Sequence, residues 1–228
     1  MNRMKILLIL SLCSLSLSNA RTEPAGNNQA ARWEEEIRTF EDWDKKNSFP
    51  SDAVLFVGSS SIRLWPTREC FGQFDVINRG FGGSQISDVV YFEGRIVLPY
   101  KPKVIVFYAG DNDIAGGKTA QRVFDDYKKF VSLVQKQLPK TQIIFISIKP
   151  SGSRWSFWNI MKNANKMIEA FSQKDDRLYY FDGAAPLLNS DGRPNNELFL
   201  SDKLHLNDKG YELWTKLLTP VIKNAMNQ

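Results

Sequence analysis

From Ala53 to the end of the chain, short apolar runs alternate with longer amphipathic runs, and this alternation constrains the possible folds most strongly. The short runs are rich in β-branched and aromatic residues and predict strands at 53–57, 75–77, 104–108, 143–147 and 178–181. The longer runs have helical periodicity and predict helices at 85–98, 119–138, 154–173 and 208–226. Strands that alternate with helices form parallel sheets covered on both faces. We therefore predict an α/β domain with a sheet of about five parallel strands.

The length and composition fit one such domain, which we place at residues 32–228. A chain of 228 residues that is 43% hydrophobic is long enough to bury a substantial core. Trp33, Ile37 and Phe40 recur at helical spacing and predict one more helix, which packs against that core before the first strand.

The first 31 residues carry the features of an export signal followed by a leader. Arg3 and Lys5 precede an apolar run at 6–17, and Ser18-Asn19-Ala20 resembles a cleavage site, so we predict a signal peptide over 1–20. A membrane anchor would need a run of roughly 20 apolar residues. A lipid-modified Cys13 is a second alternative, disfavoured by the bulky Leu12 before it. Residues 21–31 are polar and predict a mobile leader, and the protein would act in the periplasm or outside the cell.

Charge and cysteine content restrict the partners and the cross-links of the exported chain. Loss of Arg3 and Lys5 with the signal would lower the formal net charge from +5 to +3, which does not favour nucleic acid as a partner. Cys70 would then have no intramolecular partner, so we expect no structural disulfide. No stable membrane insertion is expected, and the sequence leaves the oligomeric state open.

The chain has a single histidine, His205, which excludes a zinc site built on several imidazoles but permits a hydrolytic triad. Asp202 lies three positions before it, close enough to accept a hydrogen bond from the ring. Glycine-rich and hydroxyl-bearing segments follow the first three predicted strands, at 58–61, 80–84 and 110–113. Because function in parallel sheets gathers at the carboxyl ends of strands, we expect these segments to meet.

These residue types fit nucleophilic ester hydrolysis. A serine hydroxyl such as that of Ser60 becomes a nucleophile once a base, here His205, removes its proton, and Asp202 would orient the ring. The transition state also needs donors that face the developing oxyanion. The backbone N–H of Ser60, the backbone N–H of Gly83 and the side-chain amide of Asn112 are candidates, because glycine allows close approach and asparagine donates without a charge.

Four segments resemble, in order, the conserved blocks of the SGNH hydrolases, also called GDSL-type esterases and lipases. They are Phe56-Val57-Gly58-Ser59-Ser60-Ser61-Ile62, Asn78-Arg79-Gly80-Phe81-Gly82-Gly83-Ser84, Gly110-Asp111-Asn112-Asp113 and Asp202-Lys203-Leu204-His205. The resemblance covers the chain from about Ala53 onward. It implies a flavodoxin-like three-layer α/β/α fold, ester hydrolysis without a cofactor or metal, and a Ser60–His205–Asp202 triad. It also implies an oxyanion hole formed by Ser60, Gly83 and Asn112.

Two details weaken the match to these blocks. Ser59 stands where the family usually has aspartate, a position outside the triad, so we expect activity to survive. The choice of Gly83 competes with Gly80 and Gly82.

Each segment alone also has a simpler interpretation. A serine cluster after a strand is often a helix cap, and Asp202–His205 could be a surface turn. Asp111 and Asp113 could bind magnesium in a phosphohydrolase, although Asp113 could equally cap the helix that follows. The glycine segment at 80–84 could hold a phosphate, but it lacks the lysine-containing pattern of nucleotide-binding loops.

We expect an exported serine esterase that acts on short acyl groups such as acetyl, with a small-molecule, carbohydrate or lipid ester as substrate. A lysophospholipase-like lipid esterase and an inactive binding protein on the same scaffold are the alternatives. No residue is assigned to substrate binding. Trp155 and Trp158 are expected in the core, while a residue of the segment 149–155 could line the substrate pocket.

Overall fold

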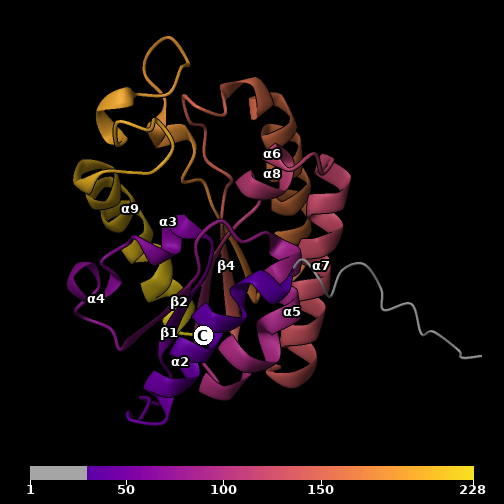
Figure 1. Ribbon diagram of the computed structural model, residues 1–228, viewed down its shortest axis with the longest axis vertical. Coiled ribbons are helices and arrows are strands. Elements are labelled where there is room, and N and C mark those ends of the chain that lie inside the picture. Colours follow the sequence, from indigo (N-terminus) through magenta and orange to yellow (C-terminus); the bar gives the residue numbers. More distant parts are fainter. Residues whose placement is uncertain (1–29) are drawn as a thin grey trace, which may run out of the picture.

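A computed structural model describes residues 30–228, and a five-stranded parallel sheet lies at its centre (Figure 1). The strands are β1 (Val54–Gly58), β2 (Val76–Gly80), β3 (Val104–Tyr108), β4 (Gln142–Ile146) and β5 (Leu178–Phe181). Their order in the sheet is β2-β1-β3-β4-β5, and all four neighbouring pairs are parallel. β2 lies on one side of β1, and β3, β4 and β5 lie on the other. The loops after β1 and β3 therefore leave the sheet in opposite directions, at the position where such folds place their ligands.

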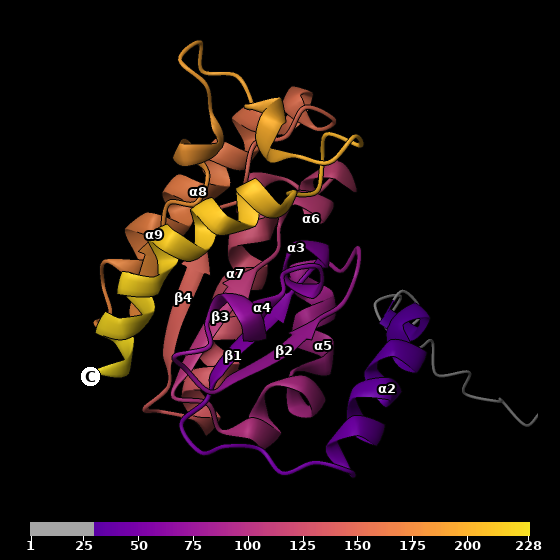
Figure 2. The same ribbon diagram turned by 90° about the vertical axis from the view of Figure 1, so that its left-hand side faces the viewer.

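Helices cover both faces of the sheet, which gives the predicted three-layer α/β/α arrangement (Figure 2). The α-helices are α2 (Glu34–Asp44), α3 (Ser60–Arg63), α4 (Thr67–Cys70), α5 (Ile86–Ile96), α6 (Asp111–Ala115), α7 (Ala120–Gln137), α8 (Trp158–Ser172) and α9 (Asp208–Met226). Short 3-10 turns occur at η1 (Ala31–Trp33), η2 (Leu98–Tyr100), η3 (Trp155–Phe157), η4 (Ala185–Leu187) and η5 (Asn196–Leu198).

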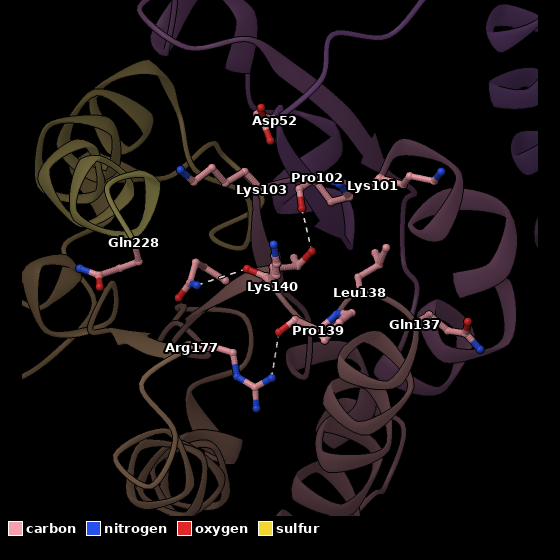
Figure 3. A pocket seen from close by; sticks show the side chains of 12 residues that line it. Asp52, Lys101, Pro102, Lys103, Gln137, Leu138, Pro139, Lys140, Arg177 and Gln228 are labelled. Atoms are coloured by element: carbon pink, nitrogen blue, oxygen red, sulfur yellow. Dashed lines mark hydrogen bonds between the residues drawn. The ribbon is translucent and has the colours of Figure 1, made fainter.

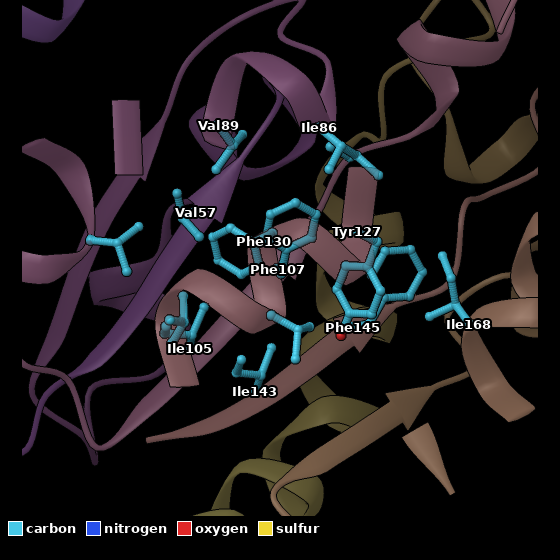
Figure 4. Close-up of a cluster of buried hydrophobic side chains, with 14 of the residues drawn as sticks. Val57, Ile86, Val89, Ile105, Phe107, Tyr127, Phe130, Ile143, Phe145 and Ile168 are labelled. Atoms are coloured by element: carbon cyan, nitrogen blue, oxygen red, sulfur yellow. The ribbon is translucent and has the colours of Figure 1, made fainter. Parts of the chain in front are cut away.

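Alternate residues of each central strand enter two separate hydrophobic cores. Leu55, Ile105 and Phe107 pack under α5, α7 and α8, where the stripe of α7 that includes Tyr127 and Phe130 is buried (Figure 4). The intervening residues of the same strands face α9, whose fully buried side chains include Trp214. Since β1, β3 and β4 are buried on both faces, their near-continuous apolar sequences are explained.

The predicted elements are confirmed, with small shifts at their ends. β1 and β4 lie one residue from the predicted positions, and β2 runs on to Gly80 rather than ending at 77. The prediction ended the strand early because Asn78 and Arg79 are polar. β2 is an edge strand, so it tolerates such partly exposed polar residues. The short helices α3, α4 and α6 were not predicted, since four or five residues are too few to show a period.

The predicted signal peptide and most of the predicted leader lie outside the described residues. Of the leader, Ala30 is buried and Ala31 begins η1. Helix α2 follows and is held to α5 by Arg95, which contacts Glu34 and Glu41. From Ala30 onward, the structure contains no helix that is both long and apolar enough to cross a membrane.

Candidate active site

Ser60, His205 and Asp202 meet at the carboxyl edge of the sheet, although 145 positions separate the serine from the histidine. Nε2 of His205 lies 3.0 Å from Oγ of Ser60, and Nδ1 lies 2.6 Å from Oδ2 of Asp202. An ionised carboxylate only accepts hydrogen bonds, so the ring proton sits on Nδ1 and the lone pair of Nε2 faces the serine hydroxyl. This is the arrangement that a general base requires.

The turn between β1 and α3 presents Ser60. Gly58 ends the strand with φ of 139°, and a Cβ there would lie 1.9 Å from the carbonyl oxygen of Tyr108 on β3, so only glycine fits. Ser60 is the first residue of α3, and its backbone N–H has no acceptor in the described part of the chain. A free N–H at a helix start can bind negative charge.

An Asx turn holds His205 in place. Oδ1 of Asp202 accepts hydrogen bonds from the backbone N–H groups of Leu204 and His205, while Oδ2 faces the ring. Lys203 adopts φ of 53° inside this turn, a conformation that is rare outside glycine. Partial burial raises the pKa of Asp202, but the hydrogen bonds from the His205 ring and the two N–H groups outweigh it and lower the pKa to about 2. The carboxylate therefore stays charged at neutral pH.

Helix α9, which follows the turn, is fastened to the serine segment. The hydroxyl of Tyr211 donates to the carbonyl of Ser61 at 3.1 Å, and the indole of Trp65 donates to Thr215 at 3.2 Å. Asn207 caps the start of the helix by accepting from the N–H of Gly210. The bonds of Tyr211 and Trp65 join the segment that carries Ser60 to the helix that follows His205.

The loop after β2 places Gly83 beside this edge with its backbone N–H free among the described residues. Gly83 has φ of 75°, and a Cβ would come within 3.3 Å of the Trp33 ring. Its competitor Gly80 donates its N–H to the side chain of Asn78, and Gly82 lies against the guanidinium of Arg63. Of the three glycines, Gly80 is thus the one whose amide is already committed.

Asn112 enters the site from the first turn of α6, and both ends of its amide are fixed. Nδ2 donates to the carbonyl of Ser84 at 2.9 Å, and Oδ1 accepts from Nη2 of Arg154 at 2.8 Å. The second N–H of Nδ2 has no acceptor in the described residues and is available to a ligand.

Comparison with known proteins supports the interpretation of these segments. Residues 62–213 match the model of the GDSL-like lipase/acylhydrolase family, which is more than half of the chain. The chain belongs to this family. The match begins two residues after Ser60, so it includes the loops of Gly83, Asn112 and His205 but not the serine itself.

This GDSL-like chain is also similar to individual proteins and solved structures over most of its length. Platelet-activating factor acetylhydrolase IB subunit alpha2 of Gallus gallus is 28% identical over 229 residues, covering 93% of this chain and 96% of that protein. A structure from Streptococcus pneumonia has a TM-score of 0.75 at 21% identity and covers 86% of this chain and 95% of its own. A carbohydrate esterase family 3 structure from Talaromyces cellulolyticus has a TM-score of 0.61 at 18% identity and covers 76% and 97%. These two structural likenesses show the shared fold.

The two acidic residues that flank Asn112 in this GDSL-like protein are already engaged. Asp111 lies 3.3 Å from Nζ of Lys149, and Asp113 accepts from the backbone N–H of Ile86 and from Lys118. The alternative in which Asp113 caps the following helix is not the one found, because its carboxylate accepts the N–H of Ile86, the first residue of α5. Burial, opposed by Lys118, raises the pKa of Asp113 to about 6. Two carboxylates with separate cationic partners give no support to the magnesium alternative.

Sequence reasoning missed the buried ionic cluster beneath the GDSL-like site. Lys149 is 1% exposed and lies 3.3 Å from both Asp111 and the hydroxyl of Tyr108, and Arg154 approaches the same carboxylate at 3.1 Å. The signal was a lysine directly after an apolar strand, where a charge is rare unless paired. Trp158 is buried as predicted, whereas Trp155 is only partly buried and stacks on it.

A large hollow lies at the opposite end of the sheet from these catalytic candidates. It measures about 790 Å³, and most of the residues that line it are polar or charged (Figure 3). Lys101, Lys103, Lys140 and Arg177 contribute the positive charge, and none of the residues implicated in hydrolysis lines it. Cys70 lies partly buried at the end of α4.

Proposed function

We propose that this protein is a serine esterase in which Ser60 is the nucleophile, His205 the general base and Asp202 the residue that orients the imidazole. The observation that carries the proposal is the pair of contacts made by His205, 3.0 Å to the serine hydroxyl and 2.6 Å to the carboxylate. Two hydrogen-bonding neighbours on opposite sides of one ring are what proton transfer from serine requires.

In the proposed first step, Oγ of Ser60 attacks the ester carbonyl while its proton passes to Nε2 of His205. The carbonyl oxygen becomes an oxyanion, which would accept hydrogen bonds from the N–H of Ser60, the N–H of Gly83 and the free N–H of Asn112. The charged carboxylate of Asp202 stabilises the imidazolium. Collapse of the intermediate breaks the ester bond, and the leaving alcohol takes the proton from His205.

Water completes the proposed cycle. It attacks the acyl-serine while His205 again accepts a proton, and a second oxyanion forms in the same position. Release of the carboxylic acid returns the proton to Ser60. In this cycle, each proton passes between Ser60, His205, the leaving alcohol and water, and the site returns to its starting state.

For the substrate, we propose short acyl groups, acetyl first, on a small or carbohydrate alcohol. The name of the Gallus gallus relative, an acetylhydrolase, supports the acyl group. The esterase from Talaromyces cellulolyticus, which shares the fold, is a carbohydrate esterase and supports the alcohol. We also propose export by the predicted signal peptide, which amino-terminal sequencing of the secreted protein would test by a first residue at position 21.

A panel of p-nitrophenyl esters from acetate to laurate, followed by acetylated sugars, tests the activity. We expect turnover to be highest with acetate and to fall by at least about 1000-fold in Ser60→Ala. Preference for laurate would instead favour the lipid esterase. EDTA should leave turnover unchanged, since loss on chelation would favour the magnesium alternative.

A fluorophosphonate probe separates an esterase from an inactive binding protein. The probe should label the wild-type protein and should not label Ser60→Ala. Absence of labelling in the wild type, together with no turnover of any ester, would refute the proposed function.

A further inference from the structure

Arg154 contacts the side chain that we propose as an oxyanion donor. Its Nη2 donates to Oδ1 of Asn112 at 2.8 Å, although the two residues are 42 positions apart and follow different strands. Arg154 lies in the loop after β4, directly before η3, and its side chain is 18% exposed. We propose that Arg154 is a positioning residue that orients and polarises the Asn112 amide toward the oxyanion; this inference rests on the proposed function.

The orientation follows from the donors and acceptors around the amide. With Oδ1 toward Arg154, Nδ2 can donate to the carbonyl of Ser84 and still has one N–H for the substrate. A half-turn of the amide would bring Nδ2 against the guanidinium, which only donates, and Oδ1 against the Ser84 carbonyl, which only accepts. The flipped state would lose both bonds and present an oxygen to the developing negative charge.

Arg154 also carries a charge in the right place to strengthen the donor. A cation that binds Oδ1 withdraws electron density from the amide, and hydrogen bonds polarise one another in series inside a protein. Nearby, Lys149 and Asp111 form a buried pair of opposite charges. The Asp111 carboxylate is therefore shared between Lys149 and Arg154, and it neutralises the positive charge of Arg154 only in part. The remaining charge acts on the Asn112 amide.

The guanidinium of Arg154 is itself held in place by Asp111. Nη1 of Arg154 lies 3.1 Å from Oδ2 of Asp111, whose Oδ1 accepts the backbone N–H of Asn112 at 3.0 Å. Asp111 thus fixes the backbone of Asn112 directly and its side chain through Arg154. Burial raises the pKa of Asp111, but Lys149 and Arg154 outweigh it and keep the pKa below the usual value.

The loop that carries Arg154 also touches the histidine turn. The N–H of Ser153 donates to the carbonyl of Lys203 at 3.1 Å, and Gly152 packs against the Lys203 side chain. One short loop therefore contacts both the turn that carries the proposed base and the proposed oxyanion donor. The ion pair with Asp111 alone would be enough for a structural role, but Arg154 uses its other terminal nitrogen to contact the Asn112 amide.

The test compares Arg154→Met, which removes the donor and the charge, with Arg154→Lys, which keeps both at a shorter reach. With p-nitrophenyl acetate, we expect kcat of the methionine variant to fall about 10- to 100-fold with little change in KM, because the lost interaction forms only in the transition state. The lysine variant should recover part of that loss. Arg193→Gln is the matched control, since this exposed arginine stacks on Trp155 at the same loop but does not contact Asn112, and its kcat should equal that of the wild type.

A double-mutant cycle with Asn112→Ala decides whether Arg154 acts through the amide. In that background, Arg154→Met should change kcat by no more than about two-fold. An equal loss of kcat in both backgrounds, an effect on KM alone, or no effect on kcat would each overturn the inference. Urea unfolding of each variant identifies loss of fold, in which case the lysine variant carries the comparison. A wild type that neither turns over esters nor reacts with the fluorophosphonate probe would refute the proposed function itself.

Discussion

Glu93 is a buried acid whose charge should make the stability of this protein fall as pH rises. It lies on the inner face of α5, is 4% exposed, and its Oε1 has no hydrogen-bond partner in the described part of the chain. Burial raises its pKa from 4.5 to about 7. Between these values the folded chain holds a proton that the unfolded chain has lost, so stability decreases as pH rises through this range.

The size of the effect follows from the two pKa values. Raising the pKa of an acid from 4.5 to about 7 on folding destabilises the folded state by about 3 kcal/mol well above pH 7 and by less than about 1 kcal/mol at pH 5. Glu93→Gln removes the charge and keeps the shape. We therefore expect the free energy of unfolding of the variant, relative to wild type, to be about 2 kcal/mol more favourable at pH 8 than at pH 5.

Urea unfolding followed by tryptophan fluorescence at the two pH values measures this difference. Any fixed cost of the new amide cancels, because it is the same at both pH values. Glu212→Gln, at an exposed position of α9, is the matched control and should show no such pH dependence. A stability difference for Glu93→Gln that is equal at pH 5 and pH 8, or smaller at pH 8, would refute the reasoning.

Three further substitutions test the site and its supports. Gly83→Ala should cost about 1–2 kcal/mol of stability in urea unfolding because of its φ of 75°, whereas Gly94→Ala on α5, where a Cβ meets nothing within 4 Å, should stabilise slightly. Asp202→Asn should lower kcat roughly 10²–10⁴-fold, because an amide can donate to Nδ1 of His205 and leave the ring proton on Nε2. In the wild type, the carboxyl pKa of about 2 should keep Asp202 ionised in assays down to about pH 4. Tyr211→Phe should lower the free energy of unfolding by about 1–2 kcal/mol through loss of its bond to Ser61 and should also lower kcat; unchanged values of both would contradict its role in fastening α9.

The sheet and its main helices were predictable because their signals are local and repeated. The apolar stretch of β3 and the stripe of α7 each reveal their element over several residues, and the alternation between the two types determines the parallel arrangement. The edge strand β2 was underestimated because Asn78 and Arg79 are partly exposed there. The unusual conformation of Lys203 depends on an Asx turn and has no periodic signal.

Some residues of the candidate site were likewise predictable from the sequence, and others were not. Ser60, Asn112 and His205 could be selected from the sequence because four segments resemble the blocks of one family in order, although each segment alone has a simpler interpretation. Arg154 could not, since an arginine in a loop usually faces solvent, and only the fold brings it to the amide oxygen of Asn112. Pairing between residues far apart in sequence is decided by tertiary structure, which one sequence does not reveal.

These long-range bonds join the loops of the site into a closed ring. From Ser60 the ring passes to His205, through the turn to Lys203, and across to the loop of Arg154. It continues from Arg154 to Asn112 and from Asn112 to Ser84, whose hydroxyl donates to the carbonyl of Phe81. The N–H of Phe81 donates to the carbonyl of Gly58, two residues before Ser60. Because each loop is bonded to the next, a displacement of one changes the geometry of its neighbours, and the donors are held before any charge develops. Electrostatic catalysis depends on such preorganisation, and in a site assembled from loops and the first turns of short helices a ring of bonds can provide the rigidity that one long helix or strand would otherwise supply.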